Sequence, residues 1–174
     1  NMETLYFKKV KELQNEKERL ERRLEVKINI QGKKVTIEGD SFKEYEALMI
    51  LEAMQFGFSA NKALTLMDEQ IVFRKIPIKS FTRRKNLTEV RGRIIGKEGK
   101  TKRTIEDISG CDLAINDGEI GIIGPAEQIE EATTAITNLI RGTKQANVYR
   151  FLERINTGKK DLSTDLGLKI KNKR

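Results

Sequence analysis

Apolar and polar residues alternate over residues 111–115, and residues 119–123 form a second short, strand-like segment in the second half of the chain. Alternation with a period of two predicts half-buried β-strands. Asn116-Asp117-Gly118 separates the two segments and is typical of a tight turn. The two segments are therefore expected to pair as a hairpin.

Segments with a helical repeat surround this hairpin. Helices are predicted over residues 86–93, 100–108, 125–140 and 147–155. Ser109-Gly110 is a typical helix stop, and Pro125 suits the first turn of a helix. A weaker alternation over residues 75–81 predicts another strand, which Pro77 restricts to a sheet edge or a strand start.

The first half of the chain repeats this pattern at an offset of 85 residues. Val35–Gly39 aligns with Ile120–Gly124, and Gly57 aligns with Gly142. The same offset pairs further apolar positions: Leu20 with Ile105, Val26 with Cys111, Ile28 with Leu113, Ile30 with Ile115, Ala47 with Ala132, Leu51 with Ile136 and Met54 with Leu139. A gapless register across strand-like and helix-like segments favours two copies of one module over a chance match of apolar patterns.

Positive charge is concentrated in one part of the 174-residue chain, whose formal net charge is +8. Residues 75–103 contain eleven Lys and Arg residues against Glu89 and Glu98, so this segment alone carries +9. Scattered lysines usually form only a solvated surface, whereas a local positive field is typical of a protein with a polyanionic partner.

Gly96-Lys97-Glu98-Gly99 lies inside this basic segment, between two predicted helices. Two glycines at this spacing let the backbone approach a bulky partner, and the free N–H groups of the following helix attract a phosphate. The candidate RNA-contacting residues are Arg83, Arg84, Arg91, Arg93, Ile95, Gly96, Lys97, Glu98, Gly99, Lys100 and Arg103. Glu98 is expected to point to solvent.

Bases of a single strand would lie on an apolar floor beside this loop. Ile95 and Ile105 are candidates for that floor, with Leu113 or Ile115 across it. Packing in the protein core is the alternative role for these side chains.

Catalytic and metal chemistry have little support. The chain has no histidine and a single cysteine, Cys111, which excludes a disulfide framework and a Cys/His zinc site. Cys111 is expected to be a small buried apolar residue. Glu106 and Asp107 are adjacent on a predicted helix and diverge, so a metal-carboxylate nuclease is disfavoured. We expect a binding protein, not an enzyme, with no cofactor and no metal.

No apolar run approaches the ~20 residues that a membrane span needs. No secretory signal peptide is visible either, so the default expectation is a monomer in a reducing, cytoplasmic setting.

The second half resembles a KH domain of the eukaryotic type, type I, over about residues 75–142. The residues that carry this resemblance are Ile94, Ile95, Gly96, Gly99, Ile105, Ile108 and Gly110. The implied fold class is α+β, with two tandem type I KH-like modules of β-α-α-β-β-α order. Each would be a three-stranded sheet backed by helices, with an extra C-terminal helix. The expected domains are residues 1–72, residues 73–157 and a flexible basic tail over 158–174.

The first copy keeps this pattern without the glycine loop. The offset places Lys11–Gln14 where Gly96–Gly99 lie, and no glycine precedes Gly32. Residues 8–23 instead predict an uninterrupted charged helix, which cannot present free backbone N–H groups in its middle. The first copy is therefore interpreted as a degenerate KH-like module with a structural or protein-binding role.

Arg91–Thr101 and Val148–Glu153 resemble the archaeal relatives of the partner-of-Nob-one family, ribosome-assembly factors of the small subunit. The resemblance covers about residues 2–155. It implies binding of single-stranded rRNA near the 3′ end of 16S rRNA. The implied protein partners are the rRNA-maturing endonuclease and the α-subunit of translation initiation factor two. The alternative is a protein-interaction adapter with secondary RNA contact, which the charged helix over residues 8–23 keeps open.

Overall fold

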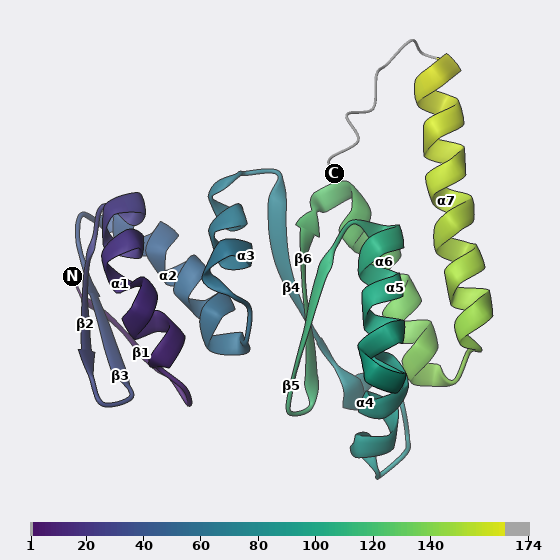
Figure 1. The fold of residues 1–174 in the computed structure, drawn as a ribbon, viewed down its shortest axis with the longest axis horizontal. Helices are drawn as coiled ribbons and strands as arrows, with labels where there is room; N and C mark the ends of the chain where they lie inside the picture. The colour runs from purple at the N-terminus through teal and green to yellow at the C-terminus, as the bar shows by residue number, and fades with distance from the viewer. Residues whose placement is uncertain (1, 166–174) are drawn as a thin grey trace.

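The computed structural model describes residues 2–165 of the chain, and the side chains of residues 2–159. The elements are stacked along the long axis of the molecule (Figure 1). A first sheet is followed by the helices of the first half, then by a second sheet, the helices that back it, and a last long helix. The two halves of the sequence therefore form an elongated α+β molecule with two separate sheets.

The first half consists of β1 (Met2–Tyr6), α1 (Lys11–Leu24), β2 (Lys27–Gln31), β3 (Lys34–Glu38), α2 (Ser41–Phe56), α3 (Ala60–Leu64) and a 3-10 turn, Thr65–Met67. Its antiparallel sheet has the strand order β1-β3-β2. Val35 and Ile37 of β3 are fully buried against the helices. Thr36 lies between them on the opposite, solvent-facing side of the sheet, as strand alternation requires.

The second half consists of β4 (Ile71–Pro77), α4 (Leu87–Ile95), α5 (Lys100–Ser109), β5 (Asp112–Asn116), β6 (Glu119–Pro125), α6 (Ala126–Arg141) and α7 (Gln145–Asp165), with 3-10 turns at Ile78–Ser80 and Lys97–Gly99. The strand order β4-β6-β5 matches that of the first sheet. The predicted hairpin is confirmed as β5–β6, and Pro77 closes β4 at the sheet edge.

Several sequence predictions need correction. The order β-α-α-β-β-α holds only for the second half, because the single helix α1 connects β1 and β2 in the first half. The strand expected over residues 75–81 begins at Ile71, two residues before the predicted domain boundary at 73. Ile71-Val72-Phe73 is a continuous apolar run, which gives no alternation signal.

The final helix is also longer than predicted. α7 continues to Asp165, ten residues beyond the end predicted at Ile155. The first part of the predicted tail, residues 158–165, is therefore helical. Residues 166–174, which the prediction also assigned to the tail, lie outside the described residues.

Individual contacts recur at the 85-residue offset. The Glu21 carboxylate accepts the Ile28 N–H at 2.9 Å, and the Glu106 carboxylate accepts the Leu113 N–H at 3.1 Å. In the same way, Gly39 packs on Val26 and Gly124 packs on the Cys111 side chain, where a Cβ at Gly124 would lie 2.5 Å from Sγ. These repeated contacts show that the register found in the sequence is also a structural register.

The offset changes upstream of α1 and α5. Val35 and Ile120 are 85 positions apart, whereas their pairing partners Leu5 and Ile76 are 71 apart. Counted between equivalent positions, the second half therefore has fourteen more residues between β4 and α5 than the first half has between β1 and α1. This additional segment contains α4. The helix predicted from residue 8 begins only at Lys11, so the positions equivalent to Gly96–Gly99 form the first turn of α1 and not its middle.

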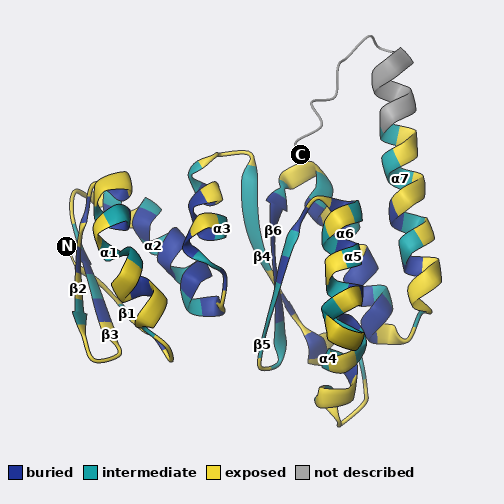
Figure 2. Ribbon diagram, viewed as in Figure 1, coloured by how far each residue is buried: buried dark blue, intermediate teal, exposed yellow. Residues whose placement is uncertain are grey.

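The second sheet is covered on both faces. Ile120 and Ile122 point into the core formed with α4–α6, while Ile123 belongs to the core of the first half. Gly121 lies beneath the aromatic rings of α2 and the following loop, so a Cβ there would be 2.6 Å from Phe56 Cε1. Burial is accordingly continuous along β6 (Figure 2).

Three aromatic rings form the centre of this junction. Phe56, Phe58 and Phe73 have ring centroids 5.6–6.1 Å apart, and Phe73 meets the other two edge to face. Lys75 Nζ lies 5.8 Å from the Phe73 ring. Because Phe73 belongs to β4, the aromatic cluster fixes the first half onto the outer face of the second sheet.

Candidate nucleic-acid interface

The Gly96–Gly99 loop makes a tight reversal between α4 and α5. Gly96, Glu98 and Gly99 have φ angles of 75°, 54° and 73°, a region that strongly favours glycine. The Gly96 N–H donates to Gly92 O at 2.8 Å, and the Gly99 N–H donates to Gly96 O at 3.2 Å. The loop is therefore a closed, hydrogen-bonded turn with one non-glycine residue in the left-handed conformation.

Gly96 is also required by contacts inside the protein. A Cβ at this position would lie 2.1 Å from Thr101 Oγ1 and 2.7 Å from the Thr101 backbone nitrogen. Thr101 is buried, so its side chain has little room to move away. The sequence interpretation gave Gly96 only a role in close approach to a ligand, and this internal packing role was missed.

Two side chains hold the loop in place. Gln145 Nε2, at the start of α7, donates to Thr101 Oγ1 at 3.0 Å and lies 3.4 Å from Arg93 O. Arg103, on α5, donates from NH1 to Glu98 O at 2.8 Å. The loop is thus braced from α5 and from α7. Sequence reasoning missed Gln145 because no local pattern connects it with a residue 44 positions away.

The N-terminus of α5 is open to an anion. Its N-cap residue is Gly99, and no side chain of the described residues caps it. The first backbone N–H groups of a helix without a cap are free to bind a phosphate oxygen. Lys97, Lys100 and Arg103 are exposed around this end, and Glu98 is exposed as predicted. Free backbone N–H groups and exposed cations therefore lie together at this end of α5, an arrangement whose chemistry suits an anion.

Arg93 has a different role from the one predicted. Its guanidinium donates to Leu139 O at 2.9 Å and to Thr143 O at 3.1 Å, and it is half-buried. Leu139 O lies in the last turn of α6, where it also accepts the Gly142 N–H, and Thr143 O lies two residues beyond the helix. Arg93 therefore caps α6 and joins α4 to it. Arg91 is also half-buried, and within the described side chains its Nε has no hydrogen-bond partner.

Arg83 and Arg84 lie away from the loop, in the segment between β4 and α4. Arg83 lines a cleft of about 290 Å³ with Lys79, Phe81 and Arg141. The Arg141 guanidinium lies 5.2 Å from the centre of the Phe81 ring. Arg84 forms an exposed ion pair with Glu89 at 3.4 Å, so it is partly neutralised. The cleft forms a second cationic surface on this half of the protein.

The predicted apolar floor is only partly present. Ile95 and Ile115 are half-buried and remain available to a ligand. Ile105 and Leu113 have exposed fractions of 0% and 2% and belong to the core, so their prediction as floor residues was wrong. Both lie on the helix-facing side of their elements, where packing between α5 and β5 requires apolar side chains.

Cys111 is a buried core residue, as predicted. Burial is the main reason that the pKa of its thiol is raised from 9.0 to about 11. A thiol with such a pKa is neutral at physiological pH and is a poor nucleophile.

Neither a metal centre nor a membrane span is visible in the part of the chain that the structure describes. No group of three or more His, Cys, Asp or Glu side chains in that part could hold a metal ion. None of its helices is long and apolar enough to cross a bilayer.

Strand order, helix placement and the Gly96–Gly99 loop define the second half as a type I KH domain. A family model agrees: the one for the second KH domain of PNO1, described as "Eukaryotic type KH-domain (KH-domain type I)", matches residues 72–157.

Relatives and solved structures give the family. KH domain-containing protein MJ0443 of Methanocaldococcus jannaschii is 34% identical over 147 residues, which cover 80% of this chain and 65% of that protein. RNA-binding protein pno1 of Dictyostelium discoideum is 30% identical over 143 residues, covering 78% of this chain and 60% of that protein. The chain therefore spans less than two thirds of the length of these curated relatives.

The crystal structure of Dim2p from Pyrococcus horikoshii OT3 matches with a TM-score of 0.77 and 32% identity, covering 88% of this chain and 99% of that one. A chain of the a/eIF2alpha-aDim2p-rRNA complex from the same organism matches with a TM-score of 0.79 and 32% identity, covering 91% and 95%. The chain belongs to the PNO1/Dim2 family of KH-domain proteins.

Proposed function

We propose that this protein is an RNA-binding assembly factor of the small ribosomal subunit, which binds single-stranded rRNA near the 3′ end of 16S rRNA through the Gly96–Gly99 loop. The observation that carries the proposal is the uncapped N-terminus of α5 behind a closed glycine turn, with Lys97, Lys100 and Arg103 exposed around it. Backbone N–H groups and cations at one point are the chemistry that grips a phosphodiester chain.

The relatives support this proposal. A matching solved structure is of a complex between aDim2p, a/eIF2alpha and rRNA, and PNO1 relatives are named as RNA-binding and pre-rRNA-processing proteins. The concentration of positive charge in residues 75–103 also supports RNA binding. Those residues include the loop and, apart from Arg141, the lining of the cationic cleft.

The first half is proposed to be a degenerate KH-like module. It has the strand order of the second half and the same Glu-to-backbone contact, but α1 replaces the glycine loop. The α-subunit of initiation factor two and the rRNA-maturing endonuclease are the proposed protein partners of the chain. If RNA contact is secondary, the protein is instead an adapter between such partners.

The test is a double substitution in the loop, Lys97→Asp with Glu98→Asp, which places two carboxylates beside the bound phosphate. Affinity would be measured by fluorescence anisotropy with a labelled single-stranded RNA of the 16S 3′-end sequence. Loss of binding with an unchanged melting temperature is expected, because both side chains are exposed.

The matched control is Arg150→Asp with Glu153→Asp on α7, which alters net charge by the same amount at two other exposed positions. The control should retain most of the affinity. Wild-type affinity in the loop variant would contradict the proposed RNA site, and equal losses in both variants would indicate a general electrostatic effect.

A further inference from the structure

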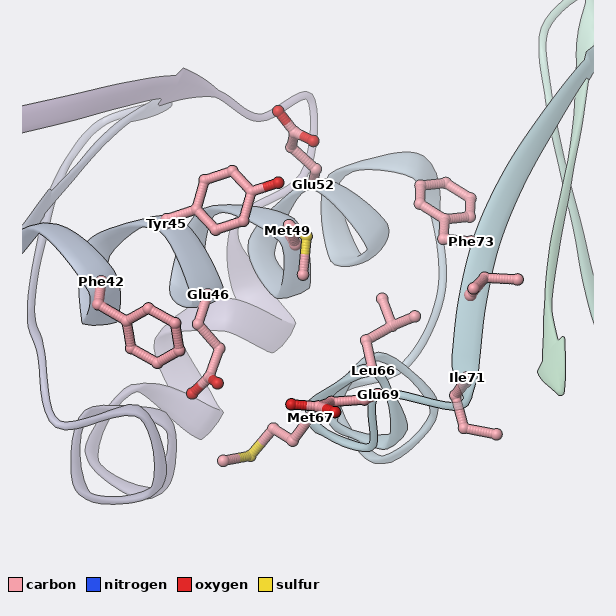
Figure 3. Close-up of a pocket in the computed structure, with 11 residues that line it drawn as sticks. Phe42, Tyr45, Glu46, Met49, Glu52, Leu66, Met67, Glu69, Ile71 and Phe73 are labelled. Carbon is pink, nitrogen blue, oxygen red and sulfur yellow. The ribbon is translucent and has the colours of Figure 1, made fainter. Parts of the chain in front are cut away.

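A groove of about 550 Å³ lies where the two halves meet, between α2 and the segment that leads into β4 (Figure 3). It is lined by Phe42, Tyr45, Glu46, Met49, Glu52, Leu66, Met67, Glu69, Ile71, Val72 and Phe73. Because α4 and α5 back the opposite face of the second sheet, the groove and the glycine loop are on different sides of that sheet (Figure 1). The RNA site therefore does not account for the groove.

The α2 wall of the groove is an apolar stripe without a cover. Phe42, Tyr45 and Met49 are spaced by three and four residues, so they share one face of the helix. Phe42 is 69% exposed and Tyr45 is 63% exposed. The opposite face of α2 is buried in the core of the first half, and a helix that is apolar on both sides is usually covered on both. Large exposed aromatic side chains beside a groove are typical of an interaction site.

The groove is negatively charged in a positively charged protein. Glu46, Glu52 and Glu69 line it, and none of its lining residues is basic. Within the described side chains none of these three carboxylates forms an ion pair, although the chain as a whole carries +8. In Figure 3 the Glu46 side chain lies beside Phe42 on the α2 wall of the groove, and Met67 and Glu69 lie on the opposite wall. A cationic group over this rim would gain Coulombic attraction from both walls.

We propose that this groove binds a cationic amphipathic helix of a protein partner. Apolar residues of that helix, spaced by three or four, would pack between Phe42 and Met49 on one wall and Leu66 and Met67 on the other. Its Lys or Arg residues would pair with Glu46 and Glu69. Methionine side chains adapt to different apolar shapes, which suits the wall of a peptide-binding groove. RNA does not fit the site, because its phosphates would face the three carboxylates.

The chain's methionines make a direct test possible. Met49 and Met67 line the groove, whereas Met54 is buried in the core and Met2 is exposed on β1. The full chain would be labelled with [13C]methyl-methionine and titrated with a designed helical peptide of about four turns, ~14 residues. The peptide carries Leu along one face and Lys and Arg on its flanks. A peptide of the same composition in scrambled order and one with Glu in place of the cations are the controls.

The expected result is a saturable shift of the Met49 and Met67 signals with the cationic peptide alone, while Met2 and Met54 stay in place. Glu46→Lys with Glu69→Lys should weaken binding of that peptide by about tenfold or more, since rim charges on both walls are reversed. Glu127→Lys with Glu153→Lys, at exposed positions on α6 and α7, alters net charge equally and should leave binding within about twofold. Phe42→Ala with Tyr45→Ala should also abolish the shifts, and both side chains are exposed enough for the fold to tolerate the change.

Several outcomes would overturn the proposal. The first is the absence of a saturable shift at Met49 and Met67, and the second is equal binding of the scrambled peptide. Shifts of the Met49 and Met67 signals on removal of residues 166–174, without any peptide, would make that basic segment the occupant. Concentration-dependent shifts with sedimentation as a dimer would make a second copy the occupant. RNA affinity should be unchanged in the Phe42→Ala with Tyr45→Ala variant, which keeps the net charge, so this test is independent of the proposed RNA site.

Discussion

Gln145 Nε2 lies 3.0 Å from Thr101 Oγ1, and this hydrogen bond joins the first turn of α7 to the first turn of α5. The hydroxyl that accepts it is the same atom that a Cβ at Gly96 would meet at 2.1 Å. Thr101 therefore packs against Gly96 of the glycine loop and is also hydrogen-bonded to Gln145 of α7. The conformation of the proposed phosphate-binding loop depends in this way on a helix that follows the KH motif.

Gly96→Ala should destabilise the protein by about 1–3 kcal/mol, because the new methyl group would collide with buried Thr101 and the φ angle of 75° is strained for alanine. Gly92→Ala on α4 is the matched control. No atom lies within 4 Å of a Cβ at that position, and alanine favours a helix, so a gain of up to about 1 kcal/mol is expected. Thermal or urea unfolding measures both changes. Equal stability of the two variants would contradict the steric role of Gly96.

Gln145→Ala should weaken RNA binding with only a small change in melting temperature, because the bond holds the loop and Gln145 itself is exposed. Amide hydrogen exchange at Gly99 and Thr101 should become faster in this variant. Asn147→Ala, two positions further along the first turn of α7 and also exposed, is the control and should affect neither property. Unchanged exchange rates in the Gln145 variant would refute the bracing role.

RNA affinity should depend strongly on salt. If four or five phosphates are neutralised, a plot of log K against log salt concentration should have a slope near −3, from about −0.7 per contact with a single strand. Arg103→Ala should make the slope shallower by about 0.7. Arg93→Ala should leave the slope unchanged but lower the melting temperature, since its guanidinium is bonded to Leu139 O and Thr143 O. A slope near zero would favour the adapter function.

The Cys111 thiol should resist modification and make stability fall at alkaline pH. Its pKa of about 11 in the folded protein exceeds the ordinary value of 9.0, so folding favours the neutral thiol. This contribution is fully present below pH 9 and is lost as the pH rises from 9 to 11. Melting curves of the wild type and Cys111→Ala should therefore converge over that interval. Rapid reaction of the native thiol with a disulfide reagent at pH 8 would contradict its burial.

Local chemistry predicted the elements around the loop. The β5–β6 hairpin, the α4 and α5 helices and the glycine turn all follow from neighbouring residues, and so does most of α1, which begins at Lys11 and not at residue 8. The role of Arg93 could not be predicted in this way, because its acceptors at Leu139 and Thr143 come from a distant helix end. An arginine in a basic segment has the same local pattern whether it faces RNA or caps a helix.

The contact between the two halves is only weakly indicated by the sequence. Ile120–Gly124 contains no polar residue, a run typical of a strand covered on both faces. The sequence interpretation used it to align the repeat and as the second strand of the hairpin, and did not predict a cover on its outer face. What covers the outer face depends on Phe56 and Phe58, which lie more than sixty positions away from Gly121 in the chain. Contacts of such sequence separation have no periodicity that a sequence pattern could display.

Gly121 and Phe56 also make the contact between the two halves one-directional. The residue equivalent to Gly121 in the first sheet is Thr36, which has a side chain where the aromatic ring would have to sit. The residues equivalent to Phe56 and Phe58 at the end of α6 are Arg141 and Thr143, which cannot form the aromatic cluster. The first half thus has the aromatic rings that make the contact but no glycine to receive such rings. The second half has the receiving glycine but no equivalent aromatic rings. Within the described residues, this contact therefore joins one pair of halves in a fixed order, and neither half can repeat it with a further unit to form a filament.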